Sequence, residues 1–209
     1  DMIFAPKKKQ GLNIHHPFYW QIISQIIILA KHYGKKTITG QLITAEWEAL
    51  HQTIGLEGEM DTWPWELIDI YASQKTWIGK LITFSKENNI DIKISHPKSN
   101  MSHNKRQNNE TIMRAIIQAG IIGEELQVFN HIRMTMKIKF MYEICDITGG
   151  NILPWVWECK QIDSEEKWPK DIERKPGNID RWKRTLGTIV IPGTFKLKKR
   201  IKQTTEWYL

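Results

Sequence analysis

Apolar side chains recur every three or four residues through most of the first ninety residues, and this spacing constrains the fold more than any other feature. Residues at such intervals lie on one face of an α-helix. Pro17, which suits the first turn of a helix, and Gly34, which suits the end of one, bracket the first stripe. Similar stripes predict helices over about 40–54, 63–71 and 77–88. The first stripe consists of Phe18, Ile22, Ile26, Leu29 and Tyr33.

The pattern changes after residue 94. Residues 95–109 contain only one strongly apolar side chain and form the clearest linker in the chain. Helical spacing returns over 112–120 and 124–136. From Lys137 the apolar residues alternate with polar ones, which favours a strand, although helix and strand both stay open for 138–148.

Strand and turn signals gather in the last third of the chain. Gly149-Gly150 predicts a turn across which residues 152–157 pair back as a hairpin. Pro192-Gly193 predicts a second turn, between strands over 187–191 and 195–201. A short strand is also expected earlier, over 90–94, where apolar and polar residues alternate.

These patterns together predict an α+β fold that is mainly α. The 209 residues, of which 41% are hydrophobic, suffice for a packed core. We expect an N-terminal helical bundle over 1–94, the polar linker over 95–109, and a smaller α+β unit with β-hairpins over 110–209.

Charge is unevenly distributed along the chain. The net charge is +5 over residues 1–36, −4 over 37–159 and +7 over 160–202. Basic ends around an acidic middle indicate a polyanionic partner that is contacted at the ends. The alternative is that lysine-rich surfaces only keep the chain soluble.

Two basic blocks, within residues 1–36 and 160–202, supply the candidate nucleic-acid contacts. Lysine and arginine side chains neutralise phosphates without reading bases, so such binding would be independent of sequence. Aromatic rings among cations can stack on exposed bases, which singles out Trp168 and Trp182, although both rings could instead anchor their segment to the core. The candidate phosphate contacts are Lys7, Lys8, Lys9, Lys167, Arg181, Lys183, Arg184, Lys196, Lys198, Lys199 and Arg200.

Catalytic and metal-binding motifs are not visible in the sequence. It has no glycine-rich phosphate loop, no nucleophile elbow and no paired-histidine zinc motif. Cys145 and Cys159 lack partners at zinc-ligand spacing, so we expect no metal and no cofactor. An enzyme would need a pocket that brings His131, Asp146 and Cys159 together. Two cysteines and no long apolar run favour an intracellular protein that does not span a membrane.

Several segments, in order, resemble one family. Phe4-Ala-Pro6 with Gly11-Leu-Asn-Ile14 and His-His-Pro17 resembles the "P…GGLGLP(D/H)P" segment that follows the polymerase core of retrotransposon reverse transcriptases. Thr39-Gly-Gln-Leu with Glu46-x-Glu48-Ala-Leu50 resembles "TGxLLRxSLEAL", and Thr76-Trp-Ile78 resembles "TWIxxLWEFL". Leu126-x-x-Phe-Asn130-x-x-Arg133 with Cys145-Asp-Ile147 resembles "LxxLNRCRLYLQxxxLxDI", and Trp168-Pro169 with Trp182 resembles "WPxQ…W".

The resemblance implies a thumb and connection region of a non-LTR-like reverse transcriptase polyprotein, between the polymerase core and a ribonuclease H-like domain. This chain has no Tyr-x-Asp-Asp motif and no ribonuclease H "DGS" strand. It would therefore be a non-catalytic segment that grips an RNA–DNA or DNA duplex, with the rest of the parent polyprotein as a second partner. The alternative is a structural or protein-interaction module. One continuous basic face would favour nucleic acid, whereas separated basic blocks would disfavour it.

Overall fold

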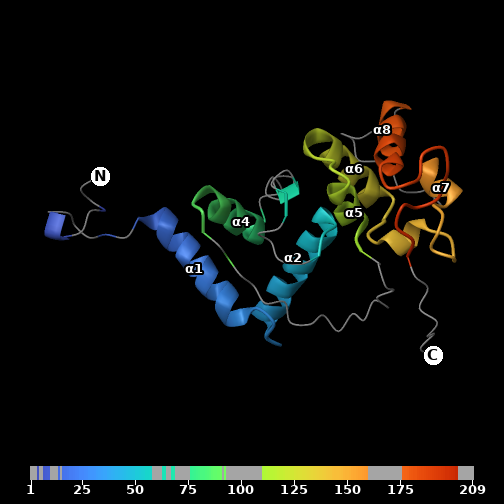
Figure 1. Ribbon diagram of the computed structural model, residues 1–209. Helices are drawn as coiled ribbons and strands as arrows, with labels where there is room; N and C mark the ends of the chain where they lie inside the picture. Colours follow the sequence, from blue (N-terminus) through green and yellow to red (C-terminus); the bar gives the residue numbers. More distant parts are fainter. Residues whose placement is uncertain are drawn as a thin grey trace.

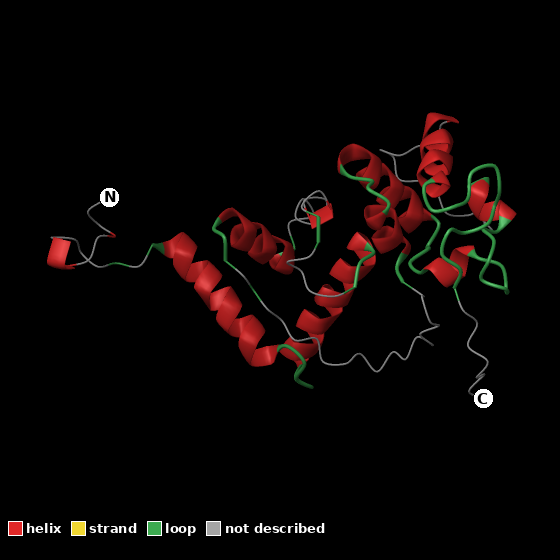
Figure 2. Ribbon diagram, in the orientation of Figure 1, coloured by secondary structure: helices red, strands yellow, loops and turns green. Residues whose placement is uncertain are grey.

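The computed structural model describes residues 4, 7–9, 14, 16–57, 63–64, 67–68, 76–90, 92, 110–159 and 176–201. This part of the chain is mainly helical, as Figure 2 shows. The elements are η2 (Lys7–Lys9), α1 (Pro17–His32), α2 (Ile38–Ile54), α4 (Trp77–Glu87), α5 (Ile112–Gln118), α6 (Gly123–Thr135), η4 (Met141–Ile144), α7 (Pro154–Trp157) and α8 (Pro176–Gly187).

The helices form two groups. α1 and α2 form a V with α4 between its arms, and α1 contacts both α2 and α4 (Figure 1). α6 packs against α5 and α8, α7 also packs against α8, and this second group lies beside the C-terminal end of α2. Buried residues of both groups form a single hydrophobic cluster. The expected linker over 95–109 lies outside the described residues, so the division into domains stays a prediction.

Threonine side chains cap the starts of α2 and α4, and a glycine ends α2. The Thr37 and Thr76 hydroxyls accept hydrogen bonds from the backbone N–H groups of Gly40 and Gly79, and each N–H would otherwise be unpaired at a helix start. Gly55 ends α2 at φ +72°, and a Cβ there would meet Arg133 Cζ at 2.7 Å. The helices predicted over 17–34, 40–54, 77–88, 112–120 and 124–136 are confirmed to within a few residues.

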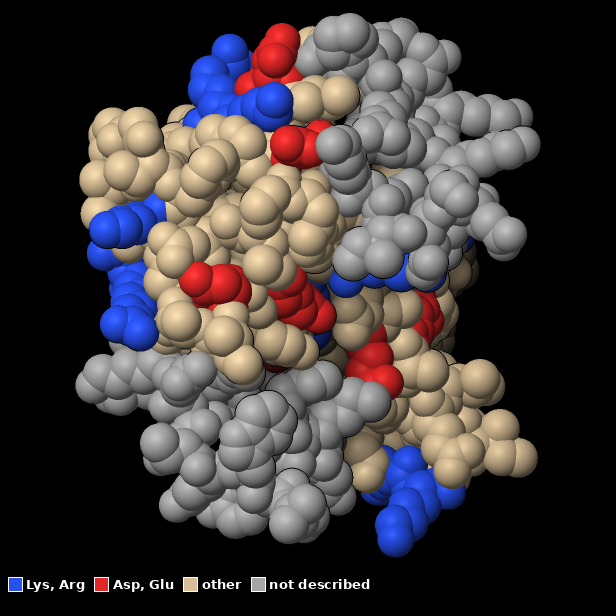
Figure 3. Space-filling view, turned by 90° about the vertical axis from the view of Figure 1, so that its right-hand side faces the viewer, with Lys and Arg blue, Asp and Glu red and all other residues tan. Residues whose placement is uncertain are grey.

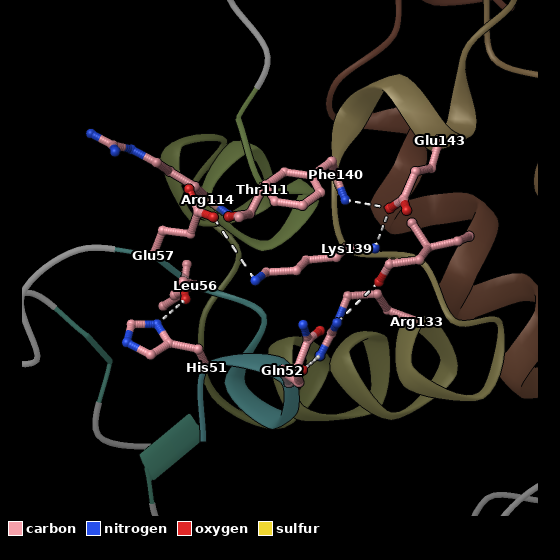
Figure 4. A network of polar contacts seen from close by, with 11 residues as sticks. His51, Gln52, Leu56, Glu57, Thr111, Arg114, Arg133, Lys139, Phe140 and Glu143 are labelled. Carbon is pink, nitrogen blue, oxygen red and sulfur yellow. Dashed lines mark hydrogen bonds and ion pairs between the residues drawn. The ribbon is translucent and has the colours of Figure 1, made fainter. Parts of the chain in front are cut away.

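The expected β-hairpin unit is wrong for the part of the chain that the structure describes. Residues 138–148 contain the 3₁₀ turn η4 in place of a strand. The Glu143 carboxylate accepts hydrogen bonds from the backbone N–H groups of Lys139 and Phe140, both at 2.6 Å (Figure 4). These bonds turn the chain, and only the single bridge between Thr111 and Phe140 forms there.

The second half of the first expected hairpin is a helical turn. Pro154 has no backbone N–H to give to a ladder, and it occupies the first turn of α7. Pairing across Gly149-Gly150 is therefore limited to one bridge, between Cys145 and Ile152.

The prediction of two final strands, over 187–191 and 195–201, is also wrong. The stretch 187–191 begins at the end of α8, and it pairs with the chain after Pro192-Gly193 through the single bridge Val190–Leu197. Leu197 donates its backbone N–H to Gly150, which belongs to a different loop, so the pairing does not extend. Most of the expected strand over 90–94 and most of the expected helix over 63–71 lie outside the described residues.

Candidate contact surfaces

The basic residues of α8 have acidic partners within the chain. Arg181 Nη1 lies 3.0 Å from Glu124 Oε1, and Arg184 Nη2 lies 2.6 Å from Glu125 Oε1. Both glutamates belong to the first turn of α6, where the helix dipole favours negative charge. Lys183, between the two arginines, is half-buried. The arginines therefore contribute less positive charge to the surface than the sequence indicated.

Trp182 lies in the core between α6, α7 and α8. Its side chain is 0% exposed, and its ring stacks on Phe129 at a centroid distance of 4.4 Å. The indole N–H donates to the Val156 carbonyl oxygen at 2.7 Å. These contacts favour the interpretation of Trp182 as an anchor rather than as a base-stacking ring. Lys167 and Trp168 lie outside the described residues.

The basic segment 196–200 is exposed except for Leu197, and contacts with the chain hold its cations. Lys198 Nζ donates to the Thr188 carbonyl oxygen at 2.8 Å, and Arg200 Nε donates to that of Thr148 at 3.1 Å. Lys199 Nζ forms an ion pair with Glu110 at 3.1 Å. Carbonyl hydrogen bonds leave the positive charge in place, so this segment keeps most of its charge. A strand over 195–201 would place Lys196, Lys198 and Arg200 on one face, because alternate residues of a strand share a face. The structure has no strand there, so this arrangement does not follow.

A turn centred on Asp146 organises the loop beside this segment. Its carboxylate accepts hydrogen bonds from the Thr148 hydroxyl, the Asn151 amide and the backbone N–H of Gly150. Burial alone would raise the pKa of Asp146, but these bonds outweigh it and lower the pKa to about 2. Gly149 and Gly150, which follow this turn, accept backbone hydrogen bonds from Ile201 and Leu197.

The two basic blocks do not meet. Lys7, Lys8 and Lys9 are exposed in η2, at the end of the molecule opposite to the segment 196–200 (Figure 1). On the face shown in Figure 3, Lys and Arg form several separate groups, some of them next to Asp and Glu. Lys7–Lys9 and the segment 196–200 therefore lie at opposite ends of the described part of the chain, and the face in Figure 3 has no continuous band of Lys and Arg between them.

The outer face of α1 is a surface that the sequence interpretation missed. Trp20, Ile23 and Ile27 are 51%, 45% and 43% exposed, and Ala30 continues their line. Their intervals of three, four and three residues form a second apolar stripe, about 120° around the helix from the predicted one. Tyr19 flanks it and is also half exposed. The spacing of this second stripe is the sequence signal that could have predicted the surface.

The inner face of α1 packs on the protein, which fixes the direction of the outer stripe. Ile22, Gln25 and Leu29 are buried there. At the two ends of the helix, ring contacts join Phe18 to Phe84 and Tyr33 to Trp47. The outer stripe is thus held on a helix that packs on the protein through its other face, and Figure 1 shows α2 and α4 on the same side of α1.

A buried arginine connects the two helix groups (Figure 4). Arg133 of α6 donates to the carbonyl oxygens of Gln52 and Thr53 at the end of α2, at 2.9 and 3.0 Å. It also donates to the Ile138 carbonyl at 3.0 Å and to Asn130 Oδ1 at 2.7 Å. Burial lowers the pKa of Arg133 to about 10, and it stays charged at neutral pH. The network is a structural joint that orients the V of helices relative to α5–α8.

The residues named for a possible enzyme have structural contacts. Asp146 accepts hydrogen bonds within its own turn, and Cys159 is buried with its Sγ 3.6 Å from Met136 Sδ. Neither contact is the nucleophile–base pair that covalent catalysis uses. No group of three or more His, Cys, Asp or Glu in the described ranges is placed to hold a metal ion. None of the helices described combines the length and apolarity that crossing a membrane requires.

No family model, curated protein or solved structure matches this chain.

Proposed function

We propose that this chain is a non-catalytic helical interaction module that binds a protein partner through the outer face of α1. The observation that carries the proposal is the stripe of Trp20, Ile23 and Ile27, each about half exposed on a helix whose other face is buried. Large apolar side chains gathered on one exposed face are typical of interaction sites.

The composition of the stripe suits a protein partner. Trp20 and Tyr19 supply large, rigid rings, and aromatic residues are enriched at the energetic centres of interfaces. The isoleucines continue the stripe along the helix, and α1 has no acidic residue. In the polyprotein that the sequence resembles, the rest of the parent chain would be one source of such a partner.

A photo-crosslinking residue at position 27 tests this function in cells that express the protein. A covalent adduct to a protein at position 27, with none at Gln118, is the expected result. Gln118 is the matched control because it is exposed on α5, away from α1. Equal yields at the two positions, or no adduct at position 27, would contradict the proposal.

Nucleic-acid contact is a second candidate, limited to the basic segment 196–200. Lys196 is exposed there, and the Lys198 ammonium keeps its charge because it donates to a carbonyl oxygen, that of Thr188. A salt titration of binding to an RNA–DNA duplex tests it, since log affinity falls with log salt by about 0.9 for each phosphate contacted. We expect Lys196→Ala to reduce this slope by about one contact, while Lys31→Ala on α1 leaves it unchanged. Binding with no salt dependence, or no binding at low salt, would rule out this candidate.

A further inference from the structure

We propose that the partner of the α1 outer face is a second copy of this chain, with the two α1 helices packed antiparallel across a two-fold axis. The inference rests on the proposed function, because it names the occupant of the same face. It is carried by the spacing, the charge distribution and the area of that face.

The spacing of the stripe is the same in both directions. Trp20, Ile23, Ile27 and Ala30 are separated by three, four and three residues. A two-fold axis beside position 25 therefore places Ile23 opposite Ile27 of the second copy, and Trp20 opposite Ala30 of the second copy. The largest side chain of the stripe then faces the smallest, which is how interdigitated helix surfaces fill space. Self-complementarity of this kind is what a two-fold interface requires.

The charges of α1 distinguish antiparallel from parallel packing. The helix carries no Asp, Glu, Lys or Arg from Pro17 to Ala30, and Lys31 is followed by Lys35 and Lys36 just beyond its end. Parallel packing would bring these cations of both copies together, whereas antiparallel packing separates them by the length of the helix. It also places Lys31 near the Trp20 ring of the second copy, where a cation–π contact is favourable.

The area sets the expected strength. From ordinary side-chain areas, the half-exposed residues Tyr19, Trp20, Ile23 and Ile27 offer on the order of 400 Å² per copy. Two copies would bury about 800 Å², which is below the roughly 1,200 Å² at which standard specific interfaces begin. The dimer is therefore weak and transient.

Sedimentation velocity of the full chain over a range of concentrations tests the proposal. We expect a monomer–dimer equilibrium, and Ile27→Glu weakens it about tenfold or more because the carboxylate faces Ile23 of the second copy. Ile28→Glu is the matched control. Ile28 is 39% exposed and adjacent in sequence, but it points about 100° around the helix from Ile27. Equal weakening by both substitutions would overturn the proposed seam.

A mixing experiment tests the antiparallel arrangement. Ile27→Glu and Ile23→Lys each disrupt self-association, but in an antiparallel pair of the two variants the introduced charges face each other. The other Ile23–Ile27 contact stays intact. We therefore expect the mixture to dimerise when neither variant does alone. Parallel packing would give no such rescue, and its absence would overturn the arrangement.

The outcomes separate this inference from the proposed function. A native chain that stays monomeric, with circular dichroism showing intact helices, overturns the second copy as partner. If position 27 still crosslinks to a different protein, the interaction module survives with another occupant. If the face instead binds anionic lipid vesicles as a monomer, both proposals fail.

Discussion

α1 and α8 are both helices with one face on the core, but their outer faces differ in charge and in what they contact. α8 carries three of the basic residues expected to contact nucleic acid, and Glu124 and Glu125 form ion pairs with its two arginines. α1 carries no charge along most of its length, and its apolar outer face stays exposed. The charge of a segment in sequence is therefore a poor guide to its surface, because folding can pair that charge internally.

The difference arises from the elements that pack against each helix. α8 lies against α6, whose first turn is acidic, so the arginines of α8 meet glutamates there. α1 forms one arm of a V and contacts α2 and α4, and Ile22, Gln25 and Leu29 are its buried residues. Surface left uncovered by folding is available for function, and on α1 that surface is apolar.

The largest expected effect compares two tryptophans. Trp182→Ala removes a fully buried ring with its Phe129 stack and Val156 hydrogen bond, so we expect a loss of about 3–5 kcal/mol in the free energy of unfolding. Trp20→Ala, on the exposed stripe, should change it by about 0.5 kcal/mol or less in the monomer. Urea denaturation at low protein concentration measures both. Similar losses would show that the outer face of α1 is part of the core.

The next effect concerns the joint between the helix groups. Arg133→Met leaves the Asn130 amide oxygen and the Gln52 carbonyl without a donor, so we expect a loss of about 3 kcal/mol. Arg114→Met, on the exposed side of α5, is the control and should cost about 0.5 kcal/mol or less. Denaturant unfolding gives both values. A neutral Arg133→Met would mean that the joint does not depend on the buried hydrogen bonds.

Acid should loosen the loop beside the basic segment. The pKa of Asp146 is lowered to about 2 in the folded protein, so its contribution to stability is complete above about pH 4 and is lost as the pH falls through 2. Discounted for solvent screening, this contribution is about 1 kcal/mol. Unfolding measured between pH 5 and pH 2, as rough limits of this titration, should show a smaller fall for Asp146→Asn. An identical fall in both proteins would contradict the role of the turn.

The smallest expected effect concerns the ion pairs of α8. Glu124→Gln and Glu125→Gln should each change stability by about 0.5 kcal/mol or less, because the pairs are exposed. Thermal unfolding at low and high salt measures this. If the double substitution also left the salt slope of duplex binding unchanged, α8 would be excluded from the nucleic-acid surface. A steeper slope would show that the glutamates mask a phosphate-binding face.

The sequence predicted helices well where their signals were local. The stripes of α1, α2 and α4 depend on residues within a few positions of one another. The hairpins failed because Glu143 captured two backbone N–H groups and Pro154 began a helical turn, and both features override alternation. α8 was not expected, although Pro176 begins it and Ile179, Trp182 and Leu186 follow at helical spacing.

The candidate site was harder to predict because it depends on contacts far apart in sequence. The burial of Trp182 requires Phe129, and the neutralisation of Arg181 requires Glu124, both in α6. The exposed stripe of α1 was visible in its spacing, but no local rule says which of two apolar faces a fold will cover. Only the V arrangement of α1 and α2 decides that.

The most direct test of the central claim is hydroxyl-radical footprinting in the cells that express the protein. If a protein partner covers the outer face of α1, oxidation of Trp20, Ile23 and Ile27 should fall well below that of the dilute purified chain. Ile122 and Ile147, exposed far from α1, should be oxidised equally in both samples. Equal oxidation of Trp20, Ile23 and Ile27 in the two samples would mean that nothing covers this face, and the account would be wrong.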